Sequence, residues 1–395
     1  MAVQKTQPDQ PASPGVRDIW VPFSHLAIWA YILYGLGLAT PYLRTDLSLT
    51  DFQAGLHASA MAAGILTAGV IADSIGRRVG AARLRVVASA LIIVAIGLVA
   101  LAPGLPVSLA GALLLGLGGG TLGTDVVIRL GRFGAAETRR LLVQANAAAM
   151  FMAAAAPLAM GLAASGLHAW RLALLLPAIA LVVLLAIRPH DSESHLSIRP
   201  PRAPLPRAYW IAWLLIVLGV SIEFSFVFWG STIVGKRTGV SSADATLLAS
   251  LFVVGMLVGR IATGRGLGAR LSPRTMLASG LVVAVAGAGL TWLSTTAVLS
   301  GLGLLLGGLG TAGLYPIGLT VALHAAPKAR LEAAARATLA SGLAVFLAPS
   351  ALGLAADAIG VVTAWLIVPG LALAGLAVLA VTPGASGTPA ESTAF

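Results

Sequence analysis

The sequence has 395 residues, of which 58% are hydrophobic and 10% are charged. An ordinary soluble domain is about 45–50% apolar and about 25% charged, so the composition excludes a water-soluble globule. The formal net charge is +11 and there are no cysteines, which excludes disulfides and thiolate metal sites. The basic residues stand in short clusters between apolar runs, a pattern that argues against a nucleic-acid partner and indicates contact with anionic membrane lipid.

Apolar runs long enough to cross a bilayer, which takes about 20 residues, follow one another along the chain. Twelve such runs predict an all-α membrane protein, because only helices of this length satisfy their own backbone in lipid. The first run is expected to be its own insertion signal, since the polar stretch before it lacks a cleavable signal pattern. The expected spans are residues 23–43, 52–72, 85–102, 106–128, 141–164, 169–187, 209–233, 244–264, 274–293, 297–322, 338–356 and 361–381.

The basic residues also orient the spans. With the N-terminus in the cytoplasm, 21 of the 25 Lys and Arg residues fall in cytoplasmic segments. The four on the other side are Arg44, Arg171, Lys236 and Arg237. Cytoplasmic segments of membrane proteins carry an excess of Lys and Arg, so we expect a multi-pass protein of a bacterial-type inner membrane with both termini in the cytoplasm.

Similar strings recur about 191 residues apart, which predicts two related halves. Residues 113–116 in the fourth span match residues 304–307 in the tenth, and residues 157–164 in the fifth match residues 349–356 in the eleventh. We therefore expect a cytoplasmic tail (1–22), an N-terminal six-helix half (23–187), a cytoplasmic linker (188–208), a C-terminal six-helix half (209–382) and a disordered tail (383–395).

The segment between the second and third spans reads Gly-Val-Ile-Ala-Asp-Ser-Ile-Gly-Arg-Arg, residues 69–78. It resembles the signature loop of the major facilitator superfamily, although Ser74 stands where many members carry Arg. The resemblance implies two six-helix bundles related by a pseudo-two-fold axis along the membrane normal. It also implies a loop that takes part in conformational switching, with Arg129 or Arg132 as a possible partner of its acid. The residues of the loop concerned are Gly69, Asp73, Gly76, Arg77 and Arg78.

The same resemblance implies a function. It favours a monomeric secondary transporter, not an enzyme, that moves a small molecule by alternating access and needs no cofactor or metal. Membrane lipids and protons are its other expected partners.

Acidic residues inside a span are costly and are candidates for function. Glu223 lies about 14 residues into the seventh span, near the expected bilayer midplane, so we expect it to carry a proton or contact substrate; a neutral, hydrogen-bonded glutamic acid is the alternative. Asp125 lies one turn before Arg129, so an i,i+4 ion pair is available to it, with a proton relay as the other interpretation.

Arg260, in the inner part of the eighth span, has two interpretations. Several anion-carrying branches of the superfamily have an arginine on this helix, and a guanidinium suits a carboxylate through two parallel hydrogen bonds. Alternatively, Arg260 snorkels to the membrane edge.

Aromatic residues gather on the first and seventh spans, where not all of them can face one cavity. The expected substrate-binding set, beside Arg260, is Trp29, Tyr34, Trp229, Tyr315 and Asn146. An acid and aromatics in an apolar interior favour proton-coupled export of amphipathic or drug-like molecules. Arg260 favours the alternative, proton-coupled uptake of a small organic anion such as a monocarboxylate.

Overall fold

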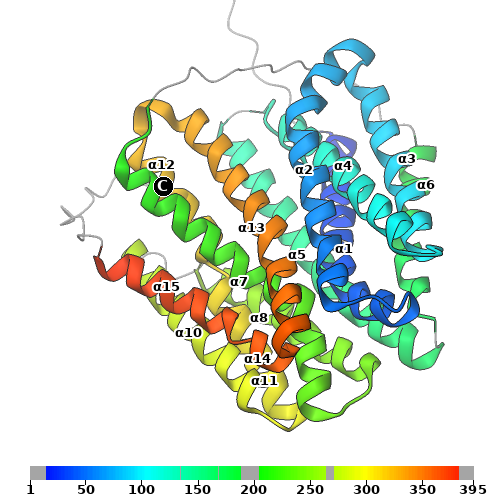
Figure 1. The fold of residues 1–395 in the computed structure, drawn as a ribbon. Helices are drawn as coiled ribbons and strands as arrows, with labels where there is room; N and C mark the ends of the chain where they lie inside the picture. Colours follow the sequence, from blue (N-terminus) through cyan, green and yellow to red (C-terminus); the bar gives the residue numbers. More distant parts are fainter. Residues whose placement is uncertain (1–14, 134, 168, 188–203, 264–270, 382–395) are drawn as a thin grey trace, which may run out of the picture. The chain divides into compact units, whose positions relative to one another are not determined.

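The computed structural model describes residues 15–133, 135–167, 169–187, 204–263 and 271–381. The expected tail at 383–395 and most of the expected linker at 188–208 lie outside these residues. The described part of the chain is helical and holds no strand, which confirms the all-α prediction (Figure 1).

The helices, in chain order, match the expected spans. They are α1 (Val16–Asp46), α2 (Asp51–Val79), α3 (Ala81–Ala100), α4 (Leu105–Leu130), α5 (Ala135–Gly166), α6 (Arg171–Ala186), α7 (Arg207–Thr238), α8 (Ser242–Ala262), α10 (Pro273–Leu293), α11 (Ala297–Thr311), α12 (Leu314–Ala325), the 3-10 turn η2 (Pro327–Ala329), α13 (Arg330–Ile359), α14 (Val361–Ala364) and α15 (Ile367–Val381). Within the described residues, eleven helical segments are long and apolar enough to cross a membrane, with α11–α12 and α14–α15 each forming one interrupted span. The sixth expected span is the shorter apolar helix α6.

The chain forms two compact units. Unit 1 comprises Met1–Ala39 with Ala60–Ile198, and unit 2 comprises Thr40–Ser59 with Arg199–Phe395. The adjoining ends of α1 and α2 therefore belong to unit 2, which the repeat in the sequence does not predict.

Polar contacts explain why the segment 40–59 belongs to unit 2. The Asp357 carboxylate, near the end of α13, accepts hydrogen bonds from the backbone N–H groups of Asp51 (2.7 Å) and Phe52 (2.9 Å). These are the first N–H groups of α2, which have no partner within the helix, and a carboxylate also suits the positive end of the helix dipole. The Tyr42 hydroxyl donates to the Ser242 carbonyl oxygen (3.1 Å).

Glycines bring the helices of unit 1 into close contact. A methyl group at Gly64 or Gly116 would overlap the backbone of the facing helix, so α2 and α4 cross with their backbones touching at this pair. Gly111 and Gly118 pack in the same way against the backbone of α3. Small residues allow such close approach in lipid, where packing, not the hydrophobic effect, holds helices together.

Unit 2 repeats these crossings. Gly255 and Gly308 bring α8 against α11, while Gly303 and Gly310 pack on the backbone of α10. The pairs correspond one to one with those of unit 1, which supports an internal duplication. The offset is 191 residues from Gly64 to Gly255 but 192 from Gly116 to Gly308, so residues 113–116 correspond to 305–308 and the expected match to 304–307 is wrong by one residue.

The signature segment, residues 69–78, is helical. It forms the last turns of α2, which runs to Val79, and the reversal into α3 occurs at Gly80, with φ 89°. A backbone of this conformation is open to glycine and strained for other residues. The expected loop is therefore wrong: the motif extends a helix beyond the span, and one glycine makes the turn.

Candidate functional site

Glu223 lies in the middle of α7, a helix of 32 residues. At 1.5 Å per residue it is roughly 24 Å from the first residue of the helix and roughly 22 Å from the last. Its side chain is buried, with 7% of the residue exposed. An ionisable side chain at this depth of a membrane helix is energetically costly. Such residues usually contact other polar groups and take part in function.

The neighbours of α7 show which way Glu223 faces. A Cβ on Gly219 would lie 2.8 Å from the Leu314 Cβ, so α7 meets the start of α12 closely there. Phe226 packs against Gly307 of α11. Residues three and four apart share a face of a helix, so Glu223, which lies between Gly219 and Phe226, faces the junction of α11 and α12.

That junction is a break within a membrane span. Proline has no N–H group, so Pro316 cannot donate to the Ala312 carbonyl oxygen, and the helix ends at Thr311 and resumes at Leu314. Tyr315, in the first turn of α12, lies within electrostatic range of Glu223 and beside Ser341 of α13. Interrupted helices near the midplane expose polar backbone and form the binding sites of many transporters.

Arg260 lies close to the same break. It is half-buried in the last turn of α8 and follows Gly259, where a Cβ would lie 2.6 Å from the Ala312 Cβ. Unit 2 thus holds Glu223, Tyr315 and Arg260 on three helices that meet around the α11–α12 break. We take this group as the candidate site.

Trp229, another expected binding residue, lies on α7. It is buried, and its indole N–H donates to the Pro349 carbonyl oxygen of α13 at 3.0 Å. Pro349 lies inside α13, where proline interrupts the backbone hydrogen bonding of a helix. The structure therefore gives Trp229 a hydrogen bond to α13, while a substrate contact stays a prediction.

The other expected binding residues belong to unit 1, so the structure does not gather them with Glu223 in one unit. Trp29 packs its ring on Gly119, where a methyl group would overlap the indole, and Tyr34 is buried farther along α1. Asn146 is exposed and donates to the Leu142 carbonyl oxygen of its own helix at 2.8 Å.

Unit 1 holds a buried charged cluster. Arg85 of α3 makes two hydrogen bonds to the Asp125 carboxylate of α4, Nε to Oδ2 at 2.8 Å and Nη2 to Oδ1 at 3.2 Å. His25 of α1 is buried within electrostatic range of Asp125, Arg85 and Arg129. Asp125 and Arg129 stand out in the sequence, whereas Arg85 is one of the 21 basic residues expected in cytoplasmic segments, because spacing along the chain does not link residues on different helices.

The signature segment forms a local ion pair. Asp73 pairs with Arg77 one turn later on α2, and Arg77 Nη2 donates to the Ser74 hydroxyl at 3.4 Å. Both partners of the ion pair are exposed, and exposed pairs contribute little to stability. Arg129 is buried beside the His25 cluster, and its expected pairing with Asp73 stays a prediction.

Comparison with known proteins agrees with this architecture. The family model of the Major Facilitator Superfamily matches residues 24–306. No curated protein matches the sequence.

Solved structures of transporters have the same fold. A bacterial homolog of the human lysosomal transporter Spinster, in an inward-facing and unoccupied conformation, superimposes with a TM-score of 0.73 at 12% identity, covering 93% of this chain and 97% of that one. A point mutant of the nucleoside transporter NupG gives 0.75 at 14% identity, covering 92% and 98%. A point mutant of the peptide transporter POT gives 0.74 at 18% identity, covering 92% and 93%. Identities this low show the fold alone.

Proposed function

The chain belongs to the Major Facilitator Superfamily and is a secondary transporter of small molecules, not an enzyme; from this premise we propose that its transport is coupled to protons through Glu223. The observation that carries the proposal is the burial of this carboxyl group at the middle of α7, facing the α11–α12 break. An acid in this position can hold a proton while the site is closed to water and exchange it when one side opens.

The proposed cycle uses Tyr315 as a second polar group. Its phenol lies within electrostatic range of Glu223, and a phenol O–H is a donor that an ionised carboxylate can accept. Protonation removes the charge and the strongest reason for that hydrogen bond, which frees Tyr315 to contact substrate. Proton binding and substrate binding thus act on the same two side chains, so each changes the free energy of the other.

We favour export of small amphipathic molecules as the direction and cargo. Aromatic residues follow Glu223 along α7, with Phe224 and Phe228 6.4 Å apart between ring centroids. Aromatic faces and a single acid suit molecules with an apolar body and a cationic or polar end.

We propose that the transporter is a monomer of a bacterial-type inner membrane. The distribution of arginines indicates that both termini lie in the cytoplasm.

The alternative is proton-coupled uptake of a small organic anion. The half-buried position of Arg260 one residue from the Gly259–Ala312 contact favours it. A guanidinium beside a helix break can bind a carboxylate by two hydrogen bonds.

The test begins with a thermal-shift screen of the purified protein against drugs, sugars and carboxylates, since a ligand of the folded state raises its apparent stability. The strongest ligand is then used for transport by proteoliposomes under an imposed pH gradient. Export of an amphipathic ligand predicts that Glu223→Gln abolishes gradient-driven accumulation, while Arg260→Ala retains it. Glu137→Gln is the matched control, because Glu137 forms a surface pair with Arg140 on α5.

The outcomes separate the proposals. Loss of accumulation in Arg260→Ala with a carboxylate ligand would favour anion uptake. Full gradient-driven accumulation in Glu223→Gln would overturn proton coupling through this residue.

A further inference from the structure

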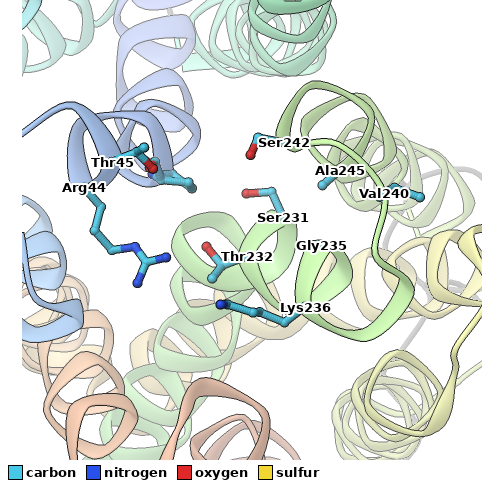
Figure 2. Close-up of a pocket in the computed structure, with 10 residues that line it drawn as sticks. Arg44, Thr45, Ser231, Thr232, Gly235, Lys236, Val240, Ser242 and Ala245 are labelled. Carbon is cyan, nitrogen blue, oxygen red and sulfur yellow. The ribbon is translucent and has the colours of Figure 1, made fainter. Parts of the chain in front are cut away.

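A polar pocket lies in unit 2, far along α7 from Glu223. It has a volume of about 260 Å³ and is formed where the end of α7 meets the start of α8 and the end of α1 (Figure 2). Every residue that lines it belongs to unit 2. The lining residues are Pro41, Arg44, Thr45, Ser231, Thr232, Gly235, Lys236, Val240, Ser242 and Ala245.

The lining carries two positive charges. Arg44 uses Nη1 to bind Asp51 at 2.7 Å, and a guanidinium has further N–H donors available. Lys236 forms no ion pair with any residue in the described part of the chain. None of the lining residues is acidic, and the charge of Lys236 is not offset by an ion pair as that of Arg44 is, so the pocket is suited to an anion.

A buried hydroxyl is also available to a ligand. Ser231 is 3% exposed, and its Oγ has no hydrogen-bond partner among the described residues. Serines in helices usually donate to the carbonyl oxygen one turn back, as Ser225 does to Ser221 at 2.7 Å on the same helix. A buried polar group without a partner is costly, so the Ser231 hydroxyl is expected to be satisfied by something in the pocket.

Figure 2 shows that the donors come from different elements and converge on one space. The Arg44 guanidinium, from α1, and the Lys236 ammonium, from α7, point toward the space beside Thr232, and Ser231 and Ser242 line the pocket above it in this view. Two cations with several hydroxyl donors form the donor set that oxyanions prefer. The volume is below the roughly 300 Å³ at which sites for drug-sized ligands begin, so a small group fits better than a drug-like substrate.

We propose that this pocket binds a phosphate group. The group is either free inorganic phosphate or the phosphate of an anionic lipid headgroup, on the face that the arginine distribution predicts to lie outside the cytoplasm. Lys236 supplies the point charge, Arg44 a second charge already oriented by Asp51, and Ser231 a buried hydrogen-bond donor. The proposal does not depend on Glu223 or on the identity of the transported molecule.

The first experiment titrates inorganic phosphate into the purified full-length protein in an uncharged detergent, at constant ionic strength. Bound phosphate is expected to raise the melting temperature. Because a hydrogen bond to a charged group is worth about 1.5–3 kcal/mol, Lys236→Gln should weaken phosphate binding roughly tenfold or more. Lys236→Arg should retain binding, and Lys328→Gln is the matched control, since Lys328 is exposed in η2 and lines no part of the pocket.

The second experiment tests the lipid source. The protein is reconstituted in phosphatidylcholine vesicles with and without one quarter phosphatidylglycerol. If the ligand is a headgroup, phosphatidylglycerol stabilises the wild type and Lys328→Gln but not Lys236→Gln, and free phosphate has little effect. If Lys236→Gln has a lower melting temperature than the wild type even without any anion, the experiments use Ser231→Ala instead. This variant is expected to lose affinity for the anion by roughly fivefold or more.

Each outcome decides the proposal. A response to phosphate or to phosphatidylglycerol that Lys236→Gln removes and Lys328→Gln retains supports it. Equal responses in all variants, or no response in either experiment, overturn it.

Discussion

The glycine crossing of α8 and α11 makes a sharp prediction. Gly308 lies against the backbone of Phe252, and a Cβ built there would be 2.8 Å from the Phe252 carbonyl carbon and 2.9 Å from the Met256 nitrogen. Because backbone atoms cannot rotate away as side-chain ends can, Gly308→Ala must push the two helices apart. Carbon atoms rest at about 3.5–4.0 Å, so the helices must separate locally by roughly 1 Å.

The cost follows from that separation. Overpacking of a tight interface typically costs about 1–3 kcal/mol, whereas replacing Gly by Ala inside a helix gains about 0.5–1 kcal/mol. The net loss of about 1–2 kcal/mol should lower the melting temperature by roughly 2–8 °C for a unit of this size. Gly116→Ala should behave alike in unit 1, where Gly116 meets Met61.

A matched control is present on α10. Gly289 lies inside that helix with nothing within 4 Å of the position of a Cβ, so Gly289→Ala should melt at the wild-type temperature or slightly above it. The assay is thermal unfolding of the purified variants in one detergent. If Gly308→Ala had the same melting temperature as Gly289→Ala, the helices α8 and α11 would not cross as closely as described. The correspondence with the α2–α4 crossing would then lose its support.

Three further variants test other contacts, each by the same melting assay. Arg85→Gln should lower the free energy of unfolding by about 3–5 kcal/mol, because it leaves Asp125 buried without this partner. The double variant with Asp125→Asn should recover most of this loss. A double variant in which the two losses simply add would refute the pairing. Asp357→Ala removes the cap on α2 and should cost about 0.5–2 kcal/mol, whereas an unchanged melting temperature would contradict the capping role. Trp229→Phe should lower the free energy of unfolding by about 0.5–1.5 kcal/mol, because it removes the indole donor to the Pro349 carbonyl oxygen; a neutral effect would show that this hydrogen bond contributes nothing.

Much of the fold could be predicted from the sequence, because lipid imposes a simple rule. Every span must be a long apolar helix, so the run lengths alone locate the helices. The ends were less predictable: α2 continues through the polar segment 69–78 to Gly80, since a helix that leaves the membrane meets no physical barrier until a residue such as glycine turns the chain. The sequence shows that the chain contains a repeat, but it does not fix the alignment of the two copies. Strings of Leu and Gly match equally well when one copy is shifted by a single residue.

The sequence predicts only those site residues that are recognisable by themselves, without knowledge of their neighbours in space. Glu223 is conspicuous because an acid in a long apolar run is rare, and Tyr315 stands beside the only proline of its span. Arg85 could not be connected to Asp125, since contacts between helices are not encoded in spacing along either one. The pocket of Arg44, Ser231 and Lys236 could not be predicted either, because its residues come from segments about 190 positions apart in the sequence.

The most direct test of proton coupling measures proton movement itself. Proteoliposomes containing a trapped pH-sensitive dye are exposed to a gradient of the ligand found by thermal shift, with no imposed pH gradient. Wild type and Glu137→Gln should move protons when the ligand is added, and Glu223→Gln should move none although it still binds ligand. A proton flux of wild-type size in Glu223→Gln would contradict the account.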